Sequence, residues 1–552
     1  MSIPGYDYVI VGAGSAGCVL ANRLSEDPAV RVLLVEAGGS DRHPLVATPL
    51  AFYRVFQHRE FTWAYQSEPE PHANGRVMPL WRGKVLGGSS SINGMTYTRG
   101  HPSGYDDWAR LAGPGWSYDE VLPYFRRAER SWRGEGPYHG ASGPLAITHV
   151  PDDPFQQLVF ETARNAGYAV VGDINAEQAE GFCAIELTVD RGRRASTAQA
   201  YLRPAIDRPN LTVLSRAHVT RVTIEHGRAS GIAFLHRGKP GRASAACEVI
   251  VSAGAYNSPQ LLMLSGIGNA EELRRHGIAV AADLPGVGRS LVDHVTVPSW
   301  YRLNRPLTLN RQLRADRAVL AALSWMVRGD GMVSRPPFSC WQFLRTRPDL
   351  SRPDVQSMFS PISPVSRLWF PGIRRATGEV FSASNTLLYP ASRGRVTIRS
   401  ADPVQPPRVL NNFLACNDDV LALRNSIKAR REFCATAPMA DHVEAELLPG
   451  PKRQTDEELD AYIRKTCSSG FHPCGTCAMG KDGAAVLDER LRVRGIDGLR
   501  VIDASAMPQI VGGNINAAVI MMAERGADLI KADRARLAAA SRDDLAAKGQ
   551  SL

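Results

Sequence analysis

Three glycines and one acid near the N-terminus have the types and spacing of a dinucleotide site. Gly12, Gly14 and Gly17 form a GxGxxG pattern. Gly12 allows a tight turn, Gly14 lets the backbone approach a pyrophosphate, and Gly17 lets a helix pack closely against a strand. The N-terminus of that helix offers free N–H groups to phosphates. Glu36 follows at the distance where a carboxylate can accept hydrogen bonds from a ribose diol, so the pattern predicts an adenine dinucleotide site.

A strand, a helix and a second strand must position these residues. Residues 6–11 and 30–35 are short apolar runs rich in β-branched side chains, which is typical of buried strands, and a helical pattern covers residues 15–25. A bare GxGxxG also arises by chance, and this chain has 49 glycines, so the alternative is a merely structural turn. We favour the dinucleotide site because both strands, the helix and Glu36 stand where the mechanism needs them.

Bulk properties limit the class of protein. The 552 residues argue for more than one domain. The net charge of +10 is modest, and the arginines are spread along the chain rather than clustered with aromatics, so we expect no nucleic-acid partner. The nine cysteines are scattered along the chain, and their odd number fits poorly with a disulfide framework. Because residues 1–5 are too short for a signal peptide, we expect a cytoplasmic protein.

One segment raises the alternative of membrane contact. No run approaches the roughly 18 apolar residues of a spanning helix, but residues 318–327 are apolar and are flanked by Arg317 and Arg328. Such a segment could place the protein peripherally on the inner membrane. The alternative, which we favour, is an ordinary packed helix.

Five glycine-bearing segments lie far apart in the sequence: residues 83–91, 254–268, 286–288, 470–480 and 512–516. If one cofactor explains them all, the chain must return repeatedly to one site. That predicts a discontinuous nucleotide-binding domain interrupted by another domain. Apolar runs at 248–252 and 498–503 are further strand-to-turn junctions of dinucleotide-domain type.

The interrupting region differs in texture. Residues 296–465 contain proline-rich loops, aromatics and strand-like stretches such as 385–389 and 395–399, which indicates an antiparallel sheet with helices, suited to a substrate domain. We expect an α/β protein, α+β overall. The expected boundaries are 1–155, 190–295 and 481–535 for the nucleotide-binding domain, 156–189 and 296–480 for the substrate domain, and 536–552 for a disordered tail.

Four landmarks match a known family in its order along the chain. They are the fingerprint with Glu36, the segment RGKVLGGSSSIN at 82–93, the segment GAYNSPQLLMLSGIG at 254–268, and a C-terminal set. This last set is HPCGTCAMG at 472–480, DASAMP at 503–508 and GNINA at 513–517. The chain resembles the glucose–methanol–choline (GMC) oxidoreductases, flavoproteins that oxidise alcohols. Its texture is similar to that of bacterial alcohol and choline dehydrogenases.

The resemblance implies a Rossmann-like domain that binds FAD. The glycine-rich segment supplies backbone N–H groups with little side-chain obstruction, and Asn93 would lie near the ring edge. Some relatives carry histidine at the position of Ile92 and bond it to the flavin, so isoleucine implies non-covalent FAD. Val219 matches an adenine contact, although a plain core valine is equally compatible. The expected cofactor-binding residues are Gly12, Gly14, Ser15, Ala16, Gly17, Glu36, Ala37, Arg82, Gly87, Gly88, Ser89, Asn93, Gly94, Val219, Ala253, Gly254, Asp503, Ala504, Asn516 and Ala517.

The resemblance also implies the catalytic residues. Alcohol oxidation needs a base that is neutral near pH 7, and His472 matches the family's catalytic histidine. Asn514 matches the second catalytic position. It cannot be the base, but it can donate a hydrogen bond to the alcohol oxygen. It is also compatible with an N-cap of the following helix.

The implied reaction is oxidation of a primary alcohol to the aldehyde, with hydride transfer to flavin N5. The reoxidant would be a quinone, an electron carrier or oxygen. The alternatives are a non-redox lyase on the same flavoprotein scaffold and a binding-only flavoprotein, and the second is disfavoured because His472 and Asn514 are both intact.

The cysteines beside His472 invite a metal site. His472, Cys474 and Cys477 form HxCxxC, but a closed zinc site needs a fourth ligand, and none is obvious beyond Cys467. We therefore expect no metal, and we disfavour a redox CxxC pair for the same loop.

Two features of the chain limit the resemblance. The family usually has asparagine at the position of Ser290. No pattern identifies one alcohol. Several aromatics of the substrate domain are candidates for an apolar pocket or a cage around a quaternary ammonium, with ordinary core packing as the alternative. These are Trp300, Tyr301, Phe338, Trp341, Trp369 and Phe370.

Overall fold

The N-terminal strand lies inside a seven-stranded sheet in the computed structural model, which describes residues 2–549. The order is β11-β2-β1-β14-β13-β12, with β25 paired to β14. The pairs β1–β2, β2–β11, β1–β14 and β14–β25 are parallel, whereas β12, β13 and β14 form an antiparallel meander. The bounds are β1 (Ser2–Val11), β2 (Val32–Val35), β11 (Leu211–Leu214), β12 (Ala217–Glu225), β13 (Arg228–His236), β14 (Lys239–Val251) and β25 (Leu499–Val501).

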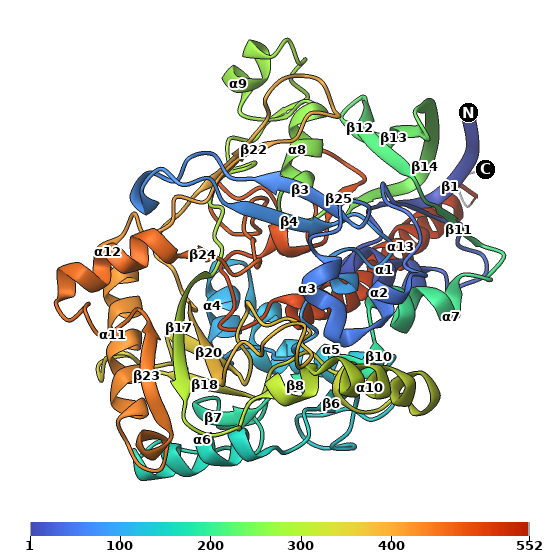
Figure 1. Cartoon of the computed structure of the whole chain (residues 1–552). Coiled ribbons are helices and arrows are strands. Elements are labelled where there is room, and N and C mark those ends of the chain that lie inside the picture. The colour runs from blue at the N-terminus through green and yellow to red at the C-terminus, as the bar shows by residue number, and fades with distance from the viewer. Residues whose placement is uncertain (1, 550–552) are drawn as a thin grey trace.

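Helices bury this first sheet. All four residues of β2 are buried, as expected for a parallel strand covered on both faces. Helix α1 (Ser15–Leu24) packs on α13 (Asn516–Gly549), which also contacts α5 (Tyr118–Ala128). Figure 1 shows α13 beside α1, so the two ends of the sequence build one layer. The tail expected to be disordered from residue 536 instead continues α13 as far as Gly549, and residues 550–552 lie outside the described residues.

A second seven-stranded sheet is antiparallel throughout. Its order is β23-β17-β20-β19-β18-β7, with β24 paired to β17. One side packs against α11 (Asn417–Cys434), α12 (Asp456–Thr466) and α6 (Pro154–Asn165), which form the left and lower border of the molecule in Figure 1. The strands are β7 (Gly181–Ala184), β17 (Val295–Leu303), β18 (Cys340–Leu344), β19 (Val355–Ser360), β20 (Val380–Leu387), β23 (Val443–Leu448) and β24 (Ser468–Ser469).

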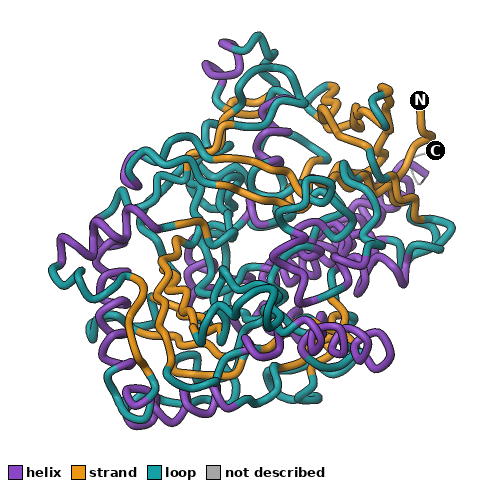
Figure 2. Tube along the Cα trace, viewed as in Figure 1, coloured by secondary structure: helices purple, strands orange, loops and turns teal. Residues whose placement is uncertain are grey.

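Loops and short elements connect the two sheets. Figure 2 shows two groups of strands with loops crossing between them. The hairpin of β3 (Thr62–Gln66) and β4 (Pro79–Gly83) leads into η3 (Gly88–Ser91), the glycine-rich segment. The remaining helices and strands are α2 (Pro44–Ala47), α3 (Phe52–Val55), α4 (Ser103–Leu111), α7 (Arg203–Ala205), α8 (Asn257–Leu264), α9 (Ala270–Arg275), α10 (Ala315–Arg328), β5 (Glu129–Ser131), β6 (Leu145–His149), β8 (Glu186–Leu187), β9 (Val189–Asp190), β10 (Arg193–Arg194), β15 (Ile267–Gly268), β16 (Ala282–Asp283), β21 (Arg395–Thr397) and β22 (Arg408–Leu410).

The expected fold class is confirmed, with a Rossmann-like sheet joined to an antiparallel one. The domain boundaries given above stay a prediction. One expectation is wrong: α10 was favoured as a packed helix, but none of its residues is buried. Among residues 2–549, no helix has the length and apolar character needed to cross a membrane.

Candidate active site

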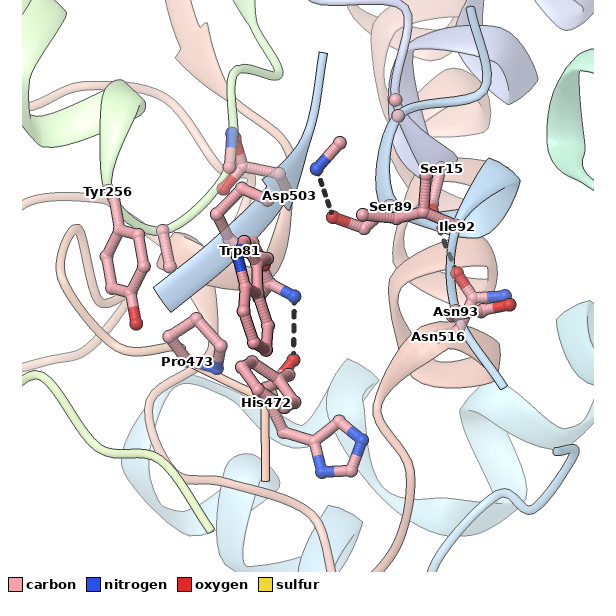
Figure 3. Close-up of a pocket in the computed structure, with 18 of the residues that line it drawn as sticks. Ser15, Trp81, Ser89, Ile92, Asn93, Tyr256, His472, Pro473, Asp503 and Asn516 are labelled. Carbon is pink, nitrogen blue, oxygen red and sulfur yellow. Dashed lines mark hydrogen bonds between the residues drawn. The ribbon is translucent and has the colours of Figure 1, made fainter. Parts of the chain in front are cut away.

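A cavity of about 530 Å³ lies where the two sheets meet, within the size range of small-molecule sites. The first sheet lines one end through β1, β2 and β12, and the second sheet lines the other end through β17, β19 and β20. Figure 3 shows Ser15, Ser89, Asn93 and Asn516 on one side of this space and His472 on the other. We call these parts the nucleotide end and the reactive end.

The glycines of the fingerprint have the geometry that the sequence predicts. Gly12 has a φ of +98°, and a Cβ there would lie 2.5 Å from the Ser252 carbonyl oxygen. A Cβ on Gly17 would lie 1.9 Å from the Gly12 carbonyl oxygen, so only glycine permits this approach of helix to strand. Gly14 is the N-cap of α1 and provides no side-chain cap, which leaves the first N–H groups of the helix free at the cavity.

Two glycines leave a cradle that fits a pyrophosphate. A Cβ on Gly14 would have its nearest neighbour 3.9 Å away, and one on Gly254 would meet no atom within 4 Å, although both residues line the cavity. The protein therefore keeps open space where a side chain would fit. Glu36 lies at the same end and accepts hydrogen bonds from the N–H groups of Ala13 (2.9 Å) and Gly38 (2.7 Å). Burial raises the pKa of Glu36 to about 7, against the lowering effect of these bonds.

Most of the predicted cofactor-binding residues line this cavity. They are Gly12, Gly14, Ser15, Ala16, Glu36, Ala37, Arg82, Gly88, Ser89, Asn93, Gly94, Val219, Ala253, Gly254, Asp503, Ala504 and Asn516. Three others, Gly17, Gly87 and Ala517, lie outside the lining. Gly17 packs α1 on β1, the Gly87 N–H donates to the Ala13 carbonyl (2.7 Å), and Ala517 is buried in α13.

Hydrogen bonds hold the distant segments in register around the cavity. The Ser15 hydroxyl donates to Asn516 Oδ1 (2.7 Å), which ties α1 to α13. The Gly83 N–H donates to Ser89 Oγ (3.1 Å), and Arg194 Nη1 donates to Asn93 Oδ1 (2.9 Å). Ile92 lies among these residues and lines the cavity.

At the reactive end, the two predicted catalytic residues lie side by side. Asn514 Nδ2 lies 3.1 Å from His472 Nε2. The other ring nitrogen, His472 Nδ1, lies 3.0 Å from Nδ1 of His294, whose Nε2 lies 3.0 Å from the Leu388 carbonyl oxygen. On the far side, Gln356 Nε2 donates to Asn514 Oδ1 (3.4 Å).

These contacts determine which atom donates and which accepts in each hydrogen bond from the Leu388 carbonyl to Gln356. The Leu388 carbonyl can only accept, so His294 carries its proton on Nε2 and its Nδ1 accepts from His472. His472 therefore carries its proton on Nδ1, and its Nε2 presents a lone pair. The same direction follows from the other end, because Asn514 must donate through Nδ2 once its oxygen accepts from Gln356. His472 is thereby held as the tautomer whose Nε2 can take a proton.

Electrostatics keep the imidazole of His472 neutral. Burial lowers its pKa well below the usual value, and His294 and Arg82 lower it further. Burial likewise lowers the pKa of His294 to about 4. Both imidazoles are therefore neutral at pH 7, each with one N–H and one lone pair.

Asp293 fixes the loop that carries the base. Its two carboxylate oxygens accept from the His472 N–H (2.7 Å) and from the Ser469 hydroxyl. Burial raises the pKa of Asp293 to about 6, while Ser469, the His472 N–H and Arg82 act in the opposite direction. Arg82 donates to the Phe471 carbonyl (2.9 Å) and so holds the same loop from the side of β4.

The GMC oxidoreductase family models match residues 6–296 and 390–523 of this sequence. The chain belongs to the GMC oxidoreductase family. It is accordingly an FAD-dependent oxidoreductase that acts on CH–OH groups.

Relatives cover nearly the whole GMC chain. An oxygen-dependent choline dehydrogenase of Photobacterium profundum is 42% identical over 530 residues, which is 95% of this chain and 93% of the relative. The mitochondrial choline dehydrogenase of Mus musculus is 41% identical, covering 95% and 89%. Among solved structures, pyridoxine 4-oxidase from Mesorbium loti superimposes with a TM-score of 0.85 at 32% identity, covering 95% and 99%.

The family's usual asparagine at the position of Ser290 has a physical explanation. Ser290 adopts a φ of +55°, in the left-handed region where asparagine is several-fold enriched among non-glycine residues. The departure therefore concerns the local backbone and leaves the GMC site intact.

The aromatic residues of the reactive end were largely missed. Of the six candidates, only Phe338 lines the cavity; Tyr301 and Trp341 are buried in apolar cores, and Phe370 is 42% exposed. The aromatic side chains that line the reactive end come mainly from residues 52–56, together with Trp81 before Arg82 and Phe471 before His472. The signal was a dense aromatic run, AFYRVFQHREFTW at 51–63, in the stretch of chain ahead of the glycine-rich segment at 83–91. His294 and Gln356 were also missed, although His294 follows the glycine motif at 286–288.

The two thiols near His472 lack the exposure and the low pKa that metal binding or redox exchange needs. Cys474 and Cys477 are fully buried free cysteines, and burial raises the pKa of both thiols. Within residues 2–549, no group of three potential ligands is placed to hold a metal ion.

Proposed function

We propose that this enzyme oxidises a primary alcohol to the aldehyde, with non-covalent FAD as the hydride acceptor at flavin N5. The observation that carries the proposal is the directed chain of hydrogen bonds in which His472 Nε2 is an acceptor. Ile92 offers no nucleophile for a covalent link to the flavin. The open cradle at Gly14 and Gly254, the free N-terminus of α1 and Glu36 would hold the dinucleotide.

In the mechanism, His472 Nε2 takes the hydroxyl proton of the substrate. Asn514 Nδ2 donates to the same oxygen and stabilises the negative charge that develops there. Gln356 keeps the amide of Asn514 in this orientation, and Asp293 and Arg82 hold the loop that carries His472. FAD, when bound, supplies the acceptor for the hydride that leaves the carbinol carbon.

The reoxidant is oxygen, a quinone or a soluble electron carrier. The relatives named oxygen-dependent choline dehydrogenases make oxygen and choline the first pair to test. Anaerobic mixing with a panel of alcohols should bleach the visible flavin band, and admission of oxygen, a quinone or a dye should restore it.

His472→Ala tests the role of the base. The variant should retain FAD but reduce it at least about 10²-fold more slowly with alcohol, because a general base contributes 10²–10⁴-fold. Reduction by dithionite serves as a control that the flavin remains competent. A variant that reduces FAD with substrate at the original rate would overturn the assignment of His472 as base.

A non-redox lyase on the same scaffold is the second candidate function. The same chain of hydrogen bonds would let His472 take a hydroxyl proton without hydride transfer. Conversion of a substrate with the flavin oxidised throughout would favour this candidate.

A further inference from the structure

The floor of the reactive end is one face of the antiparallel sheet. Side chains alternate between the two faces of a strand, so residues two apart share a face. Gln356 and Met358 on β19 and Ser384 and Thr386 on β20 line the cavity in this way. Thr296 on β17 continues the row, since it pairs with Thr386, which pairs with Gln356. All five side chains are uncharged.

The wall above this floor is aromatic. Ring centroids lie 4.9 Å apart for Phe56 and Trp81, 5.5 Å for Trp81 and Phe471, and 5.2 Å for Phe52 and Phe338. Tyr53 completes the group, with its ring 4.0 Å from that of Phe52. Such a wall suits an apolar substrate body, and π faces also attract cations, so the wall alone does not decide the charge of the substrate.

The charged side chains around the cavity indicate which substrate charge the reactive end accepts. Of the described residues that line it, Glu36 and Asp503 are the acidic ones, and both lie at the nucleotide end. Their oxygens already accept from backbone groups, Glu36 from Ala13 and Gly38, and Asp503 from Gly254 and Ser505.

The reactive end itself contains a cation. Arg82 lines it, and its guanidinium is anchored to the Trp81 and Phe471 carbonyls beneath the aromatic wall. Asp293 lies behind the His472 loop, outside the lining, where its oxygens accept from Ser469 and His472 and its charge is set against that of Arg82. Among residues 2–549, no carboxylate lines the reactive end to pair with a substrate cation.

We propose that the reactive end selects an uncharged alcohol with an apolar or aromatic body over a quaternary ammonium alcohol such as choline. This inference rests on the proposed alcohol oxidation. A quaternary ammonium entering this space loses its hydration, finds no lining carboxylate and approaches the guanidinium of Arg82. An uncharged body of the same shape fits the same wall without these costs. The substrate then differs from the one in the names of the choline dehydrogenase relatives.

The test compares alcohols of one shape that differ only in charge. Choline is paired with 3,3-dimethylbutan-1-ol, and 4-(trimethylammonio)benzyl alcohol with 4-tert-butylbenzyl alcohol. Anaerobic stopped-flow measurement of flavin reduction in the holoenzyme gives the ratio of reduction rate to Kd for each. We expect the uncharged member of each pair to exceed its cationic partner at least tenfold. Equal or better reduction by the cations would overturn the proposal while leaving alcohol oxidation intact.

A variant pair tests the electrostatic cause. Thr296→Glu places a carboxylate on the floor, and Thr296→Gln adds a similar side chain without charge. We expect Thr296→Glu to shift the ratio between choline and its uncharged partner at least tenfold toward choline, while Thr296→Gln retains the preference for the uncharged alcohol. The same shift in both variants would contradict an electrostatic cause.

Failure of the proposed function gives a different result. If no alcohol reduces the flavin, alcohol oxidation is refuted, and the charge preference is then measured as binding. Perturbation of the visible flavin spectrum during titration gives Kd for each member of a pair. Tighter binding of the uncharged members supports the selectivity, and tighter binding of the cations refutes it.

Discussion

His472 acquires its role from neighbours that approach it from three separate segments. His294 precedes β17, Gln356 lies on β19, and Asn514 precedes α13. None of these side chains needs to be charged to direct the proton, because each has one free donor or acceptor once its outer partner is set. The base is thus selected by hydrogen-bond direction, and burial keeps its imidazole neutral.

Replacement of His294 should therefore test whether His472 needs a hydrogen-bond acceptor at its Nδ1. In His294→Ala, His472 Nδ1 loses its acceptor, and we expect flavin reduction to fall about 10²-fold. Water admitted beside the ring relieves burial and raises the pKa of His472 toward its ordinary value. Because the neutral form is the base, activity is lost as pH falls through this pKa, so the acid limb of the pH profile should move to higher pH.

His294→Asn is the matched control. Its Oδ1 can accept from His472 Nδ1 in place of the imidazole nitrogen, so it should retain most of the reduction rate. Anaerobic stopped-flow reduction between pH 5 and pH 9 measures both variants. Equal losses in the asparagine and alanine variants would contradict the role of His294 as the acceptor for His472 Nδ1.

In the turn between β1 and α1, different glycines serve folding and cofactor binding. Gly17 serves the contact of helix and strand, and Gly14 leaves open space at the cavity. The sequence predicted both roles because the motif is local and each glycine has a fixed place in it. Asn514 was predicted from its motif, but His294 and Gln356 could not be predicted in this way, since their contacts depend on strand register and on segments more than a hundred residues apart.

Alanine substitutions should separate these two roles. Gly14→Ala meets no protein atom closer than 3.9 Å, so the chain should fold, but its methyl group occupies the cradle and should weaken FAD binding at least tenfold, about 1.4 kcal/mol. Gly17→Ala forces a Cβ to 1.9 Å from the Gly12 carbonyl oxygen and should therefore reduce the fraction of protein that folds. Circular dichroism of the apoproteins and titration with FAD measure the two effects. Normal FAD affinity in a folded Gly14→Ala protein would contradict the cradle.

A buried charge network joins Glu129 of β5 to residues of three loops. Arg99 and His139 both contact Glu129, and His139 also contacts Asp173 (2.6 Å). Burial disfavours the charged imidazole, but its hydrogen bonds to Asp173 and Glu129 outweigh burial and raise the pKa of His139 to about 9. The network therefore holds a protonated histidine at neutral pH.

This network predicts a pH-dependent stability. A group whose pKa is higher in the folded state stabilises the protein below its unfolded pKa, about 6.5, and loses that contribution as pH rises through about 9. We expect the loss to be of the order of 2 kcal/mol between pH 6.5 and pH 9.5. Urea unfolding of the wild type and His139→Gln at both pH values measures it, with exposed His226→Gln as control. Equal pH dependence in the wild type and His139→Gln would contradict the prediction.

At the scale of the whole molecule, the sequence predicted the two sheets and the return of the chain to one site, because each glycine-rich segment is a local signal. Four of the five segments line the cavity, and residues 286–288 do not. The sequence did not predict how α10 packs against the rest of the protein. Its period marks an apolar face, but the packing of that face depends on distant segments. In the structure α10 packs beside the loop of residues 363–378, where the Ala315 N–H donates to the Trp369 carbonyl (2.9 Å), and no α10 residue is buried.

The surface formed by α10 and this loop concentrates exposed apolar side chains. Nine of the fifteen large hydrophobic residues exposed in the described chain belong to it, with Leu320 at 66% and Ile373 at 85%. Its exposed arginines include Arg317, Arg328 and Arg374, which form no ion pair with a described carboxylate. Exposed apolar side chains together with arginines that pair with no described carboxylate fit an anionic bilayer surface. After α10, η7 (Met332–Ser334) packs on η1 (Pro49–Ala51), next to Phe52 and Tyr53 of the cavity.

We therefore expect the holoenzyme to bind vesicles that contain phosphatidylglycerol and not vesicles of phosphatidylcholine alone. Each arginine near an anionic surface contributes about 1 kcal/mol, so binding should weaken in high salt. The combined variant Leu320→Asn, Leu323→Asn and Ile373→Asn should lower the affinity at least about tenfold, because inserted side chains of this size contribute 1.5–3 kcal/mol each when fully buried. Val77→Asn with Val404→Asn removes exposed apolar side chains elsewhere and should leave vesicle binding unchanged. Sedimentation with vesicles measures all three proteins, and equal binding by the two variants would show that α10 does not dock on the bilayer.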